Sequence, residues 1–262
     1  MSWFEAKDYF SLSKEEELES LFSASNMVWD ILDLLEGFIR DSIKPNVSAL
    51  LAEGPLMTKA AALIEGEAIF GVEWEEDNGL KVFKEGHLIE GAALVMPGAY
   101  IAGDSIEIKR GAIIEPGAML KGPTIIGEET EVRQGAYVRG SVLSFKGCVI
   151  GHATEAKNLL MLEGAKAGHF AYLGDSLLGG DVNLGAGTKL ANLKMVQAPF
   201  RFKAGGETIE VKRRKFGAVL GDKVETGCNS VTSPGVLMGP GSKLLPNVTA
   251  KGGYYPPRSL IH

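Results

Sequence analysis

Aliphatic side chains recur at every sixth position through the middle of the chain, with small or turn-forming residues between them. The repeating positions are Ile108, Ile114, Leu120, Ile126, Val132 and Val138. A six-residue period fits neither an α-helix nor an isolated β-strand. It is typical of a parallel β-helix, in which each group of six supplies a short strand and a bend. The pattern therefore predicts a mainly β fold with a β-helix over residues 95–250.

Three such groups make one triangular coil, so residues 18 apart should stack about 4.8 Å from one another. A single coil cannot bury its apolar side chains, whereas stacked coils share one narrow core. The phase slips near residues 140–148 and then resumes in two further runs and a last one. Their positions are Met161, Ala167 and Leu173, then Leu178, Leu184 and Leu190, and finally residues 220, 226, 232, 238, 244 and 250. Each slip predicts a bend with one residue more or fewer.

The N-terminal residues 1–60 follow a helical pattern instead. Ser13 and Glu16 form a capping-box pair at the start of a first helix. A second helix is expected from about Asn26 to Pro45, followed by a short third helix over 46–53. The expected apolar face of the second helix comprises Val28, Ile31, Leu34, Leu35 and Phe38. We interpret this segment as a structural cap or a subunit contact.

Three further segments depart from both periods. Residues 61–94 form a β-like lead-in, with a hairpin signal at residues 77–79. Residues 194–215 alternate in twos around Gly205 and Gly206, which predicts a β-hairpin arm inserted in the β-helix. Because a lone hairpin is marginally stable, the arm should lean on a neighbouring coil or subunit. The tail, 251–262, contains two glycines and two prolines and is expected to be irregular.

Composition narrows the class of protein. The chain has 262 residues with 45% hydrophobic residues and a net charge of −6, which argues against a nucleic-acid partner. Cys148 and Cys228 show no disulfide-framework spacing, so we expect reduced thiols. The first ten residues lack the apolar core of a signal peptide, and no apolar run reaches the roughly 18 residues of a membrane span. We therefore expect a cytoplasmic protein with no membrane span.

His169 is the strongest candidate for chemistry. It precedes a Gly-rich turn at 185–187, and a neutral imidazole can accept the proton of an amine or hydroxyl that attacks a thioester. A Gly-rich corner can present a backbone N–H to the resulting oxyanion. A lone histidine is more often structural, so the residue type alone is weak evidence. A zinc site would need three converging histidines, and only His152 lies close in sequence, so we expect no metal.

Several cations could hold a phosphate. Arg133, Lys157 and residues 212–215 are the candidates, although charge alone more often marks a solvated surface. Lys157 lies twelve residues before His169, which places the two on different sides of the triangle. The return leg of the arm should bring Lys215 back beside Asn192.

Four stretches together carry a family resemblance: AGHFAYLGD at 167–175, VNLGAGT at 182–188, AN at 191–192 and RRKFGAVLGDKVETGCN at 213–229. From about residue 133 to residue 248 the chain resembles the acetyltransferase half of the bifunctional N-acetylglucosamine-1-phosphate uridylyltransferase/glucosamine-1-phosphate acetyltransferase. It is most similar to archaeal-type sugar-1-phosphate nucleotidylyltransferases that carry the same domain.

The resemblance implies a left-handed parallel β-helix, a homotrimer, acetyl-CoA as the acyl donor, and sites in clefts between neighbouring coils. It makes His169 the catalytic base. The positions that match sugar-phosphate contacts are Arg133, Glu155, Lys157, Tyr172, Asn183, Asn192 and Lys215. Those that match the lining of the acetyl-CoA slot are Ala186, Cys228 and Pro246. The 18-residue spacing of Cys228 and Pro246 predicts that they stack in successive coils. In the tail, Arg258 is a candidate for a phosphate of CoA.

Two departures from the family affect the expected activity. The uridylyltransferase half is not present in this chain, so nucleotidyl transfer is not expected. Leu193 stands where many bacterial members have a tyrosine, and the arm is longer than theirs. We expect an acetyl-CoA-dependent acetyltransferase that acts on an amino-sugar phosphate resembling glucosamine 1-phosphate, or on a nucleotide sugar. The alternatives are a non-catalytic sugar-binding or assembly protein and a sugar acyltransferase that uses acyl carrier protein.

Overall fold

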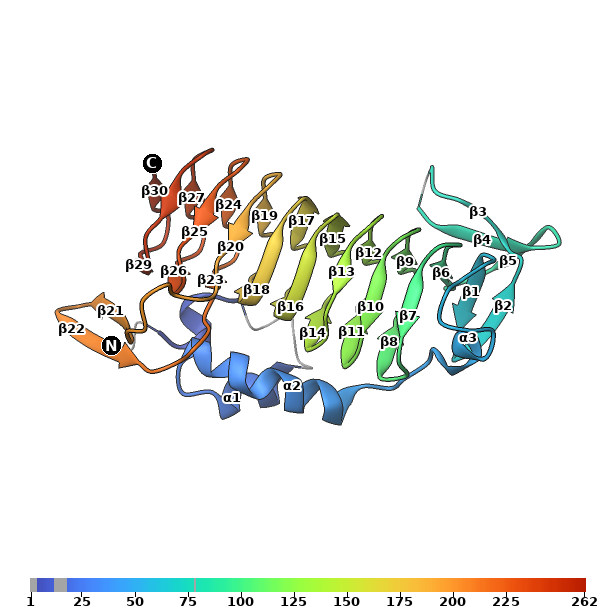
Figure 1. Cartoon of the computed structure of the whole chain (residues 1–262), viewed down its shortest axis with the longest axis horizontal. Coiled ribbons are helices and arrows are strands. Elements are labelled where there is room, and N and C mark those ends of the chain that lie inside the picture. Colours follow the sequence, from blue (N-terminus) through green and yellow to red (C-terminus); the bar gives the residue numbers. More distant parts are fainter. Residues whose placement is uncertain (1–3, 12–17, 78) are drawn as a thin grey trace.

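The structure of the protein is a computed structural model that describes residues 4–11, 18–77 and 79–262. It is mainly β, as predicted, and consists of triangular coils stacked along one axis (Figure 1). Each strand pairs in parallel with the strands one coil before and after it. The coils are consistent with the left-handed parallel β-helix that the resemblance implies.

The three sides of the triangle are three faces of the β-helix. The first face comprises β6 (Ala93–Val95), β9 (Ile113–Ile114), β12 (Glu131–Val132), β15 (Val149–His152), β17 (Lys166–His169), β19 (Asn183–Leu184), β24 (Glu225–Thr226), β27 (Lys243–Leu244) and β30 (Leu260–Ile261). The second face comprises β7 (Tyr100–Ala102), β10 (Met119–Lys121), β13 (Tyr137–Val138), the first halves of β16 (Glu155–Met161) and β18 (Tyr172–Leu178), β20 (Lys189–Leu190), β25 (Val231–Thr232) and β28 (Thr249–Ala250). The third face comprises β8 (Ile106–Ile108), β11 (Thr124–Ile126), β14 (Val142–Ser144), the second halves of β16 and β18, β23 (Ala218–Leu220), β26 (Val236–Met238) and β29 (Gly253–Tyr255).

The six-residue pattern corresponds to the interior of this stack. All six residues of the first run, Ile108 to Val138, are buried in one core that continues through every coil. The predicted phase slip is a coil one residue shorter, because Val142 pairs with Leu159 rather than with the residue after it. The next coil is equally short, since Met161 pairs with Leu178.

The third face is buried on both sides. Its outward-pointing residues form a second apolar core with the N-terminal helices and the arm. These residues are Ile125, Leu143, Leu160, Leu177, Val219 and Leu237. In Figure 1 the helices α1 (Glu19–Ala24) and α2 (Ile31–Ser42) run along this side of the coils. Helices α1 and α2 therefore cover a side of the β-helix, whereas α3 (Ser48–Ala52) lies at its N-terminal end, beside β1 (Ala61–Ile64) and β2 (Glu67–Phe70).

The helices differ in detail from the expected ones. Residues Val28–Asp30 form a short 3-10 turn, and α2 begins only at Ile31. Because that turn rotates the register, Leu32 is 3% exposed whereas Leu34, expected in the apolar face, is 36% exposed. Another 3-10 turn spans Ala6–Asp8, and α3 spans Ser48–Ala52. The expected capping box at Ser13 lies outside the described residues. No helix in the described part of the chain is long and apolar enough to cross a membrane.

Antiparallel strands close the N-terminal end of the β-helix. The hairpin of β1 (Ala61–Ile64) and β2 (Glu67–Phe70) joins the first face through β6. Beside it, β3 (Glu73–Glu75), β4 (Lys81–Lys84) and β5 (His87–Ile89) form a separate three-stranded sheet. Of the expected turn between β3 and β4, residue 78 lies outside the described residues.

The arm is the hairpin that its alternation predicts. Strands β21 (Phe200–Ala204) and β22 (Glu207–Val211) pair antiparallel around Gly205 and Gly206, both at positive φ. The arm leans on its own chain, because Phe202 stacks on Trp29 with ring centroids 5.1 Å apart.

The tail is not irregular, so that expectation was wrong. Strand β29 pairs with β26 and β30 pairs with β27, which adds a last coil to the stack. Pro256 and Pro257 fall at the bend between these strands, where the missing amide hydrogens remove no ladder hydrogen bond.

Tyr9 offers a test of the N-terminal packing. Its side chain is 1% exposed, and its hydroxyl has no hydrogen-bond partner among the described residues. Burial raises the pKa of this phenol far above its usual range. Since a buried unsatisfied hydroxyl costs about 1–3 kcal/mol, Tyr9→Phe should stabilise the protein by about 1 kcal/mol. Urea denaturation would measure this.

The matched control is Tyr255→Phe, because the Tyr255 hydroxyl donates to the Lys251 carbonyl at 2.9 Å. This variant should leave stability unchanged or lower it slightly. A loss of stability in Tyr9→Phe would mean that the buried hydroxyl has a partner.

Candidate active site

One column of residues runs along the corner between the first and second faces. Strand register places each residue over the equivalent residue of the next coil. The column comprises His152, His169, Ala186, Cys228 and Pro246. The expected stacking of Cys228 and Pro246 is confirmed, because Thr226 pairs with Leu244 two residues earlier. The corner thus aligns the candidate base with the three residues expected to line the acyl-donor slot.

His169 ends β17 and points outward. The residue is exposed, whereas Ala167, two positions earlier, is fully buried in the core. Phe170 turns the corner at φ 53° and is itself 56% exposed. The carbonyl of His169 accepts the N–H of Gly187 at 2.9 Å, which fixes the backbone beneath the ring. Its imidazole has no hydrogen-bond partner among the described residues and is free to meet a ligand.

The second face presents Tyr172 next to this corner. Tyr172 stacks between Glu155 of the coil before and Lys189 of the coil after. Burial raises the pKa of the Tyr172 phenol, and a hydrogen bond to Asn192 acts in the opposite direction. A Cβ on Gly174 would come within 2.6 Å of both the Tyr172 hydroxyl and the Asn192 amide nitrogen. The absence of a side chain at Gly174 therefore lets these two polar groups meet over the face.

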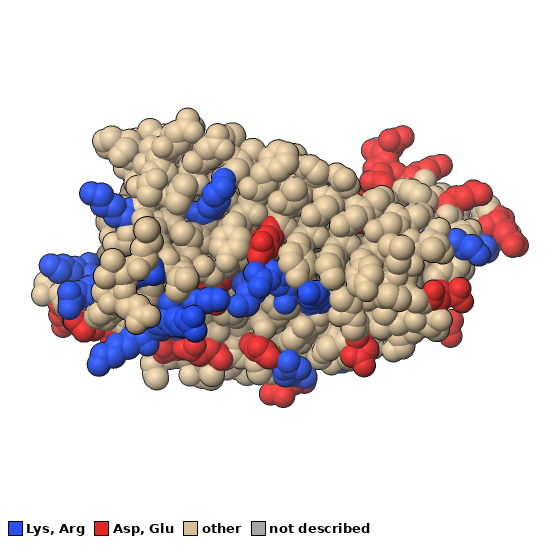
Figure 2. Space-filling view, viewed as in Figure 1, with Lys and Arg blue, Asp and Glu red and all other residues tan. Residues whose placement is uncertain are grey.

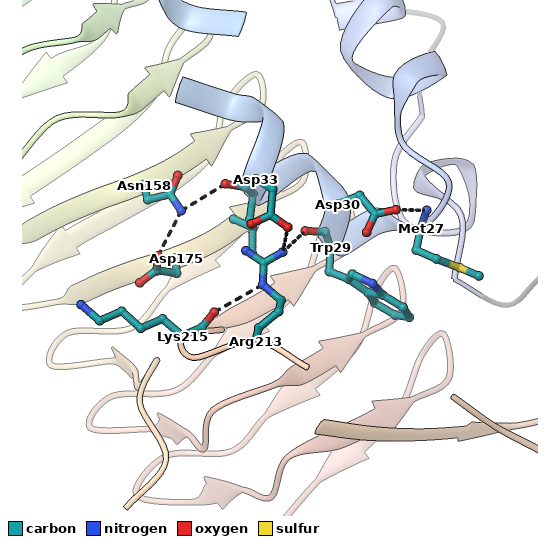
Figure 3. A network of polar contacts seen from close by, with 9 residues as sticks. Met27, Trp29, Asp30, Asp33, Asn158, Asp175, Arg213 and Lys215 are labelled. Atoms are coloured by element: carbon teal, nitrogen blue, oxygen red, sulfur yellow. Dashed lines mark hydrogen bonds and ion pairs between the residues drawn. The ribbon is translucent and has the colours of Figure 1, made fainter. Parts of the chain in front are cut away.

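The Asp175 carboxylate holds Asn192 at the far edge of the second face, and Figure 3 shows the contact of Asp175 with Asn158. Asp175 Oδ2 accepts from Asn192 Nδ2 at 2.6 Å, and Asp175 Oδ1 accepts from Asn158 Nδ2 at 3.0 Å. Asn158 also donates to the carbonyl of Leu32 at 3.3 Å, which ties this network to α2. Asn192 is only 8% exposed, so its amide is held in one orientation.

The return leg of the arm is fixed in the same region. Leu193 and Lys215 form an antiparallel bridge, which confirms that Lys215 returns beside Asn192. Arg213 Nη1 donates to Asp33 Oδ2 at 2.6 Å and to the Trp29 carbonyl at 2.9 Å. Figure 3 shows the Lys215 side chain extending away from Arg213, on the side where Asp175 lies. Arg213 therefore anchors the arm, and Lys215 remains available.

A basic band crosses the second face. Lys157 lies over Gly174, and Arg139 and Lys121 occupy the equivalent position in the two preceding coils. Figure 2 shows lysine and arginine side chains forming a nearly continuous band from the middle of the β-helix to the arm. Arg139 Nη1 contacts Glu155 Oε1 at 2.6 Å, and this hydrogen bond raises the pKa of Arg139. Sequence reasoning missed Arg139, although its 18-residue spacing from Lys157 could have revealed it.

Three predicted residues lie elsewhere. Arg133 follows Val132 on the first face and is bound to Glu131 Oε2 at 2.7 Å, so within one subunit it does not lie beside Lys157. The residue that stacks on Lys157 is Arg139, which comes six residues after Arg133 and so lies one side of the triangle further along the coil. Asn183 also lies on the first face, between Lys166 and Glu225 of the adjacent coils. Arg258 occupies the corner between the third and first faces, away from the Pro246 column.

Comparison with known proteins gives a partial match. No protein-family model matches the chain. The bifunctional sugar-1-phosphate nucleotidylyltransferase/acetyltransferase of Sulfurisphaera tokodaii is 40% identical over 90 residues, which are 34% of this chain and 22% of that protein. The bifunctional protein GlmU of Methanococcus vannielii is 38% identical over 86 residues, 33% of this chain and 20% of its own length. GlmU of Methanocaldococcus jannaschii is 34% identical over 83 residues, 32% of this chain and 20% of its own length.

The chain thus spans about a fifth of the length of the relatives that it matches. The sequence similarity and the observed parallel β-helix both favour an acetyltransferase domain of the β-helix type. Across about a third of its length the chain is similar to the bifunctional sugar-1-phosphate nucleotidylyltransferase/acetyltransferase and GlmU proteins, and its parallel β-helix is consistent with an acetyltransferase β-helix domain.

Proposed function

We propose that the protein is an acetyl-CoA-dependent N-acetyltransferase that acts on an amino-sugar phosphate. The observation that carries the proposal is the order of groups around one corner. An exposed imidazole stands in a column with the Gly-rich turn after it, and the adjacent face carries a phenol, an amide and several cations. Acyl transfer needs a general base and a backbone N–H that stabilises the oxyanion. Binding of a sugar phosphate needs hydrogen-bonding groups for the sugar hydroxyls and cations for the phosphate.

The reaction can be written with the groups at this corner. His169 takes a proton from the sugar amine as its nitrogen attacks the thioester carbonyl. The N–H of Ala186 donates to no other described residue and stabilises the oxyanion. When the tetrahedral intermediate collapses, the C–S bond breaks and the imidazolium returns a proton to the CoA thiolate. No metal is required for these steps.

The second face would hold the sugar phosphate. Lys157 and Lys215 have no ion-pair partner among the described residues, so a phosphate can take both charges without displacing a carboxylate. Tyr172 and Asn192 are held close together and would bind sugar hydroxyls. Glu155 would contact the amine, and its pairing with Arg139 keeps it near Tyr172. Charge-assisted contacts of this kind are among the stronger polar contacts available.

A complete site would need a second copy of the chain. Asn183 lies on the first face, and one subunit does not bring it to the second face. We propose a homotrimer in which the first face of one subunit approaches the second face of the next, so that Asn183 completes a cleft. The N-terminal helices cover the third face and leave the other two open to such contacts (Figure 1).

Release of free thiol from acetyl-CoA, measured with a panel of amino-sugar phosphates, tests the activity. Thermal-shift measurements with acetyl-CoA alone separate a catalyst from a scaffold, which should show no shift. Thiol release from acetyl-CoA in the presence of one or more of these sugars is the expected result. A blank panel together with no acetyl-CoA shift would overturn the proposal.

Lys157→Gln should raise KM for the sugar phosphate about tenfold or more, because one charge-assisted contact is worth about 1.5–3 kcal/mol. Arg40→Gln is the matched control, since Arg40 lies on α2, over the third face, and is already paired with Glu36. Steady-state kinetics with varied sugar at saturating acetyl-CoA would measure both. An equal effect of the two variants would show that the phosphate does not bind at Lys157.

A further inference from the structure

A cavity of about 580 Å³ lies at the base of the arm, beside the candidate sugar site. This volume is in the range of ordinary small-molecule sites. Its walls come from the outgoing leg of the arm, including Leu193, Met195 and Phe200, and from the return leg, including Lys212 and Arg214. The cavity exists only because the 194–215 insertion leaves the β-helix and returns at the same corner.

The charges of the cavity are unequally engaged. Arg213 is bound to Asp33, and Lys194 donates to the Pro199 carbonyl at 2.8 Å above the Phe200 ring. In contrast, Lys212 and Arg214 are exposed and have no ion-pair partner among the described residues. Two unpaired cations on the wall of a cavity favour an anionic ligand.

The other wall is apolar. Leu193 is 53% exposed, and Met195 is fully exposed at 102%. Exposed apolar side chains next to unpaired cations suit a ligand that joins an anionic group to a flat, less polar ring. A nucleoside diphosphate has this composition, whereas inorganic phosphate or a free sugar phosphate would leave the apolar wall unused.

The position of the cavity indicates which part of the substrate it would take. Across the second face the order is His169, Tyr172, Lys157 with Gly174, and then Asn192 with Lys215. Leu193 and Arg214 are the chain neighbours of Asn192 and Lys215, so the cavity begins where the sugar phosphate would end. The basic band in Figure 2 reaches the arm, with acidic side chains along its lower edge. The acyl-donor column lies at the opposite corner.

We propose that this cavity binds the nucleoside diphosphate of a nucleotide-linked amino sugar, so that the acetyl acceptor is a nucleotide sugar rather than a sugar 1-phosphate. The inference rests on the proposed function and specifies its substrate. The diphosphate lies along Lys157, Lys215 and Arg214, and the nucleoside lies between Lys212 and the apolar wall.

The first experiment measures binding without catalysis. UDP, GDP and dTDP are titrated calorimetrically against the wild type, the Lys212→Gln/Arg214→Gln double variant and Lys203→Gln. Lys203 is an exposed arm lysine outside the cavity and serves as the matched control. At about tenfold per lost charged contact, the double variant should weaken nucleotide binding about 100-fold, and the control should not change it.

The second experiment compares acceptors. Wild-type kcat/KM should be higher for an amino sugar linked to UDP, GDP or dTDP than for glucosamine 1-phosphate, and the double variant should lose that preference. Circular dichroism melting checks that both variants are folded.

The outcomes separate the two proposals. Acetylation of a sugar 1-phosphate with no binding of any nucleoside diphosphate would overturn the nucleotide subsite and leave the acetyltransferase intact. Displacement of the bound nucleotide by CoA would also overturn it, because the cavity would then belong to the acyl donor. Nucleotide binding that depends on Lys212 and Arg214, without acetylation of any acceptor, would support the subsite and overturn acetyl transfer.

Discussion

Replacing His169 by alanine is expected to lower kcat for acetyl transfer by about 10²–10⁴-fold, the usual contribution of a positioned general base. The KM for acetyl-CoA should change little, since the ring is proposed to act on the attacking amine. The fold should be unaffected, because the side chain is exposed and packs against no core residue. Thiol release measured with a saturating acceptor would report the change.

His152→Ala is the matched control. This histidine occupies the same column one coil earlier, and its Nδ1 lies 2.8 Å from the carbonyl of Gln134. Its loss should leave kcat within a few-fold of wild type. Equal activity of wild type and His169→Ala, or a loss of activity confined to His152→Ala, would move the base one coil along the β-helix or remove it altogether.

Gly151→Ala should produce the largest loss of stability that a single added methyl group can cause here. Gly151 is a buried first-face residue next to the His169 corner. A Cβ at this position would collide with the backbone carbonyl of Gly168 in the next coil. Backbone cannot move aside as a flexible side chain can, so we expect a destabilisation of about 3 kcal/mol or more. Urea denaturation monitored by circular dichroism would measure it.

Gly168→Ala provides the comparison, because an added Cβ there would meet no heavy atom within 4 Å. This variant should cost less than about 1 kcal/mol. If the two alanine variants were equally stable, the two coils would not approach as closely as the structure places them. If only Gly151→Ala lost activity without losing stability, the glycine would matter for the site rather than for the stacking.

The sequence by itself determined the β-helix, because its inward positions recur at a fixed interval. The run from Ile108 to Val138 predicts which residues enter the core, and the structure buries all six. The 18-residue spacing also predicts vertical neighbours, as it did for Cys228 and Pro246. The hairpin of the arm is also determined by local sequence, since the alternation around Gly205 and Gly206 predicts it without reference to the rest of the chain.

Within the candidate site, the sequence indicated Lys157 and Tyr172 but not how they are supported. Asp175 holds Asn192, and Asn158 connects that pair to α2, through contacts between residues 17 and 126 positions apart. Nor did the sequence show that Arg133 and Lys157 lie on different faces of one subunit. A difference of six residues moves a side chain from one face of the triangle to the next. Cations therefore share a face only when a whole coil, about 18 residues, separates them, as it does for Arg139 and Lys157.

What covers the third face was decided only by the tertiary structure. Consecutive apolar residues such as those of β26 are typical of a strand buried on both sides, but they do not say which segment buries them. The N-terminal helices and the arm meet there because their own apolar faces have no other partner. The ion pair between Arg213 and Asp33 then fixes the arm, and so shapes the cavity beside the site. The six-residue period is set by each coil alone, whereas these contacts arise only when distant segments fold against one another.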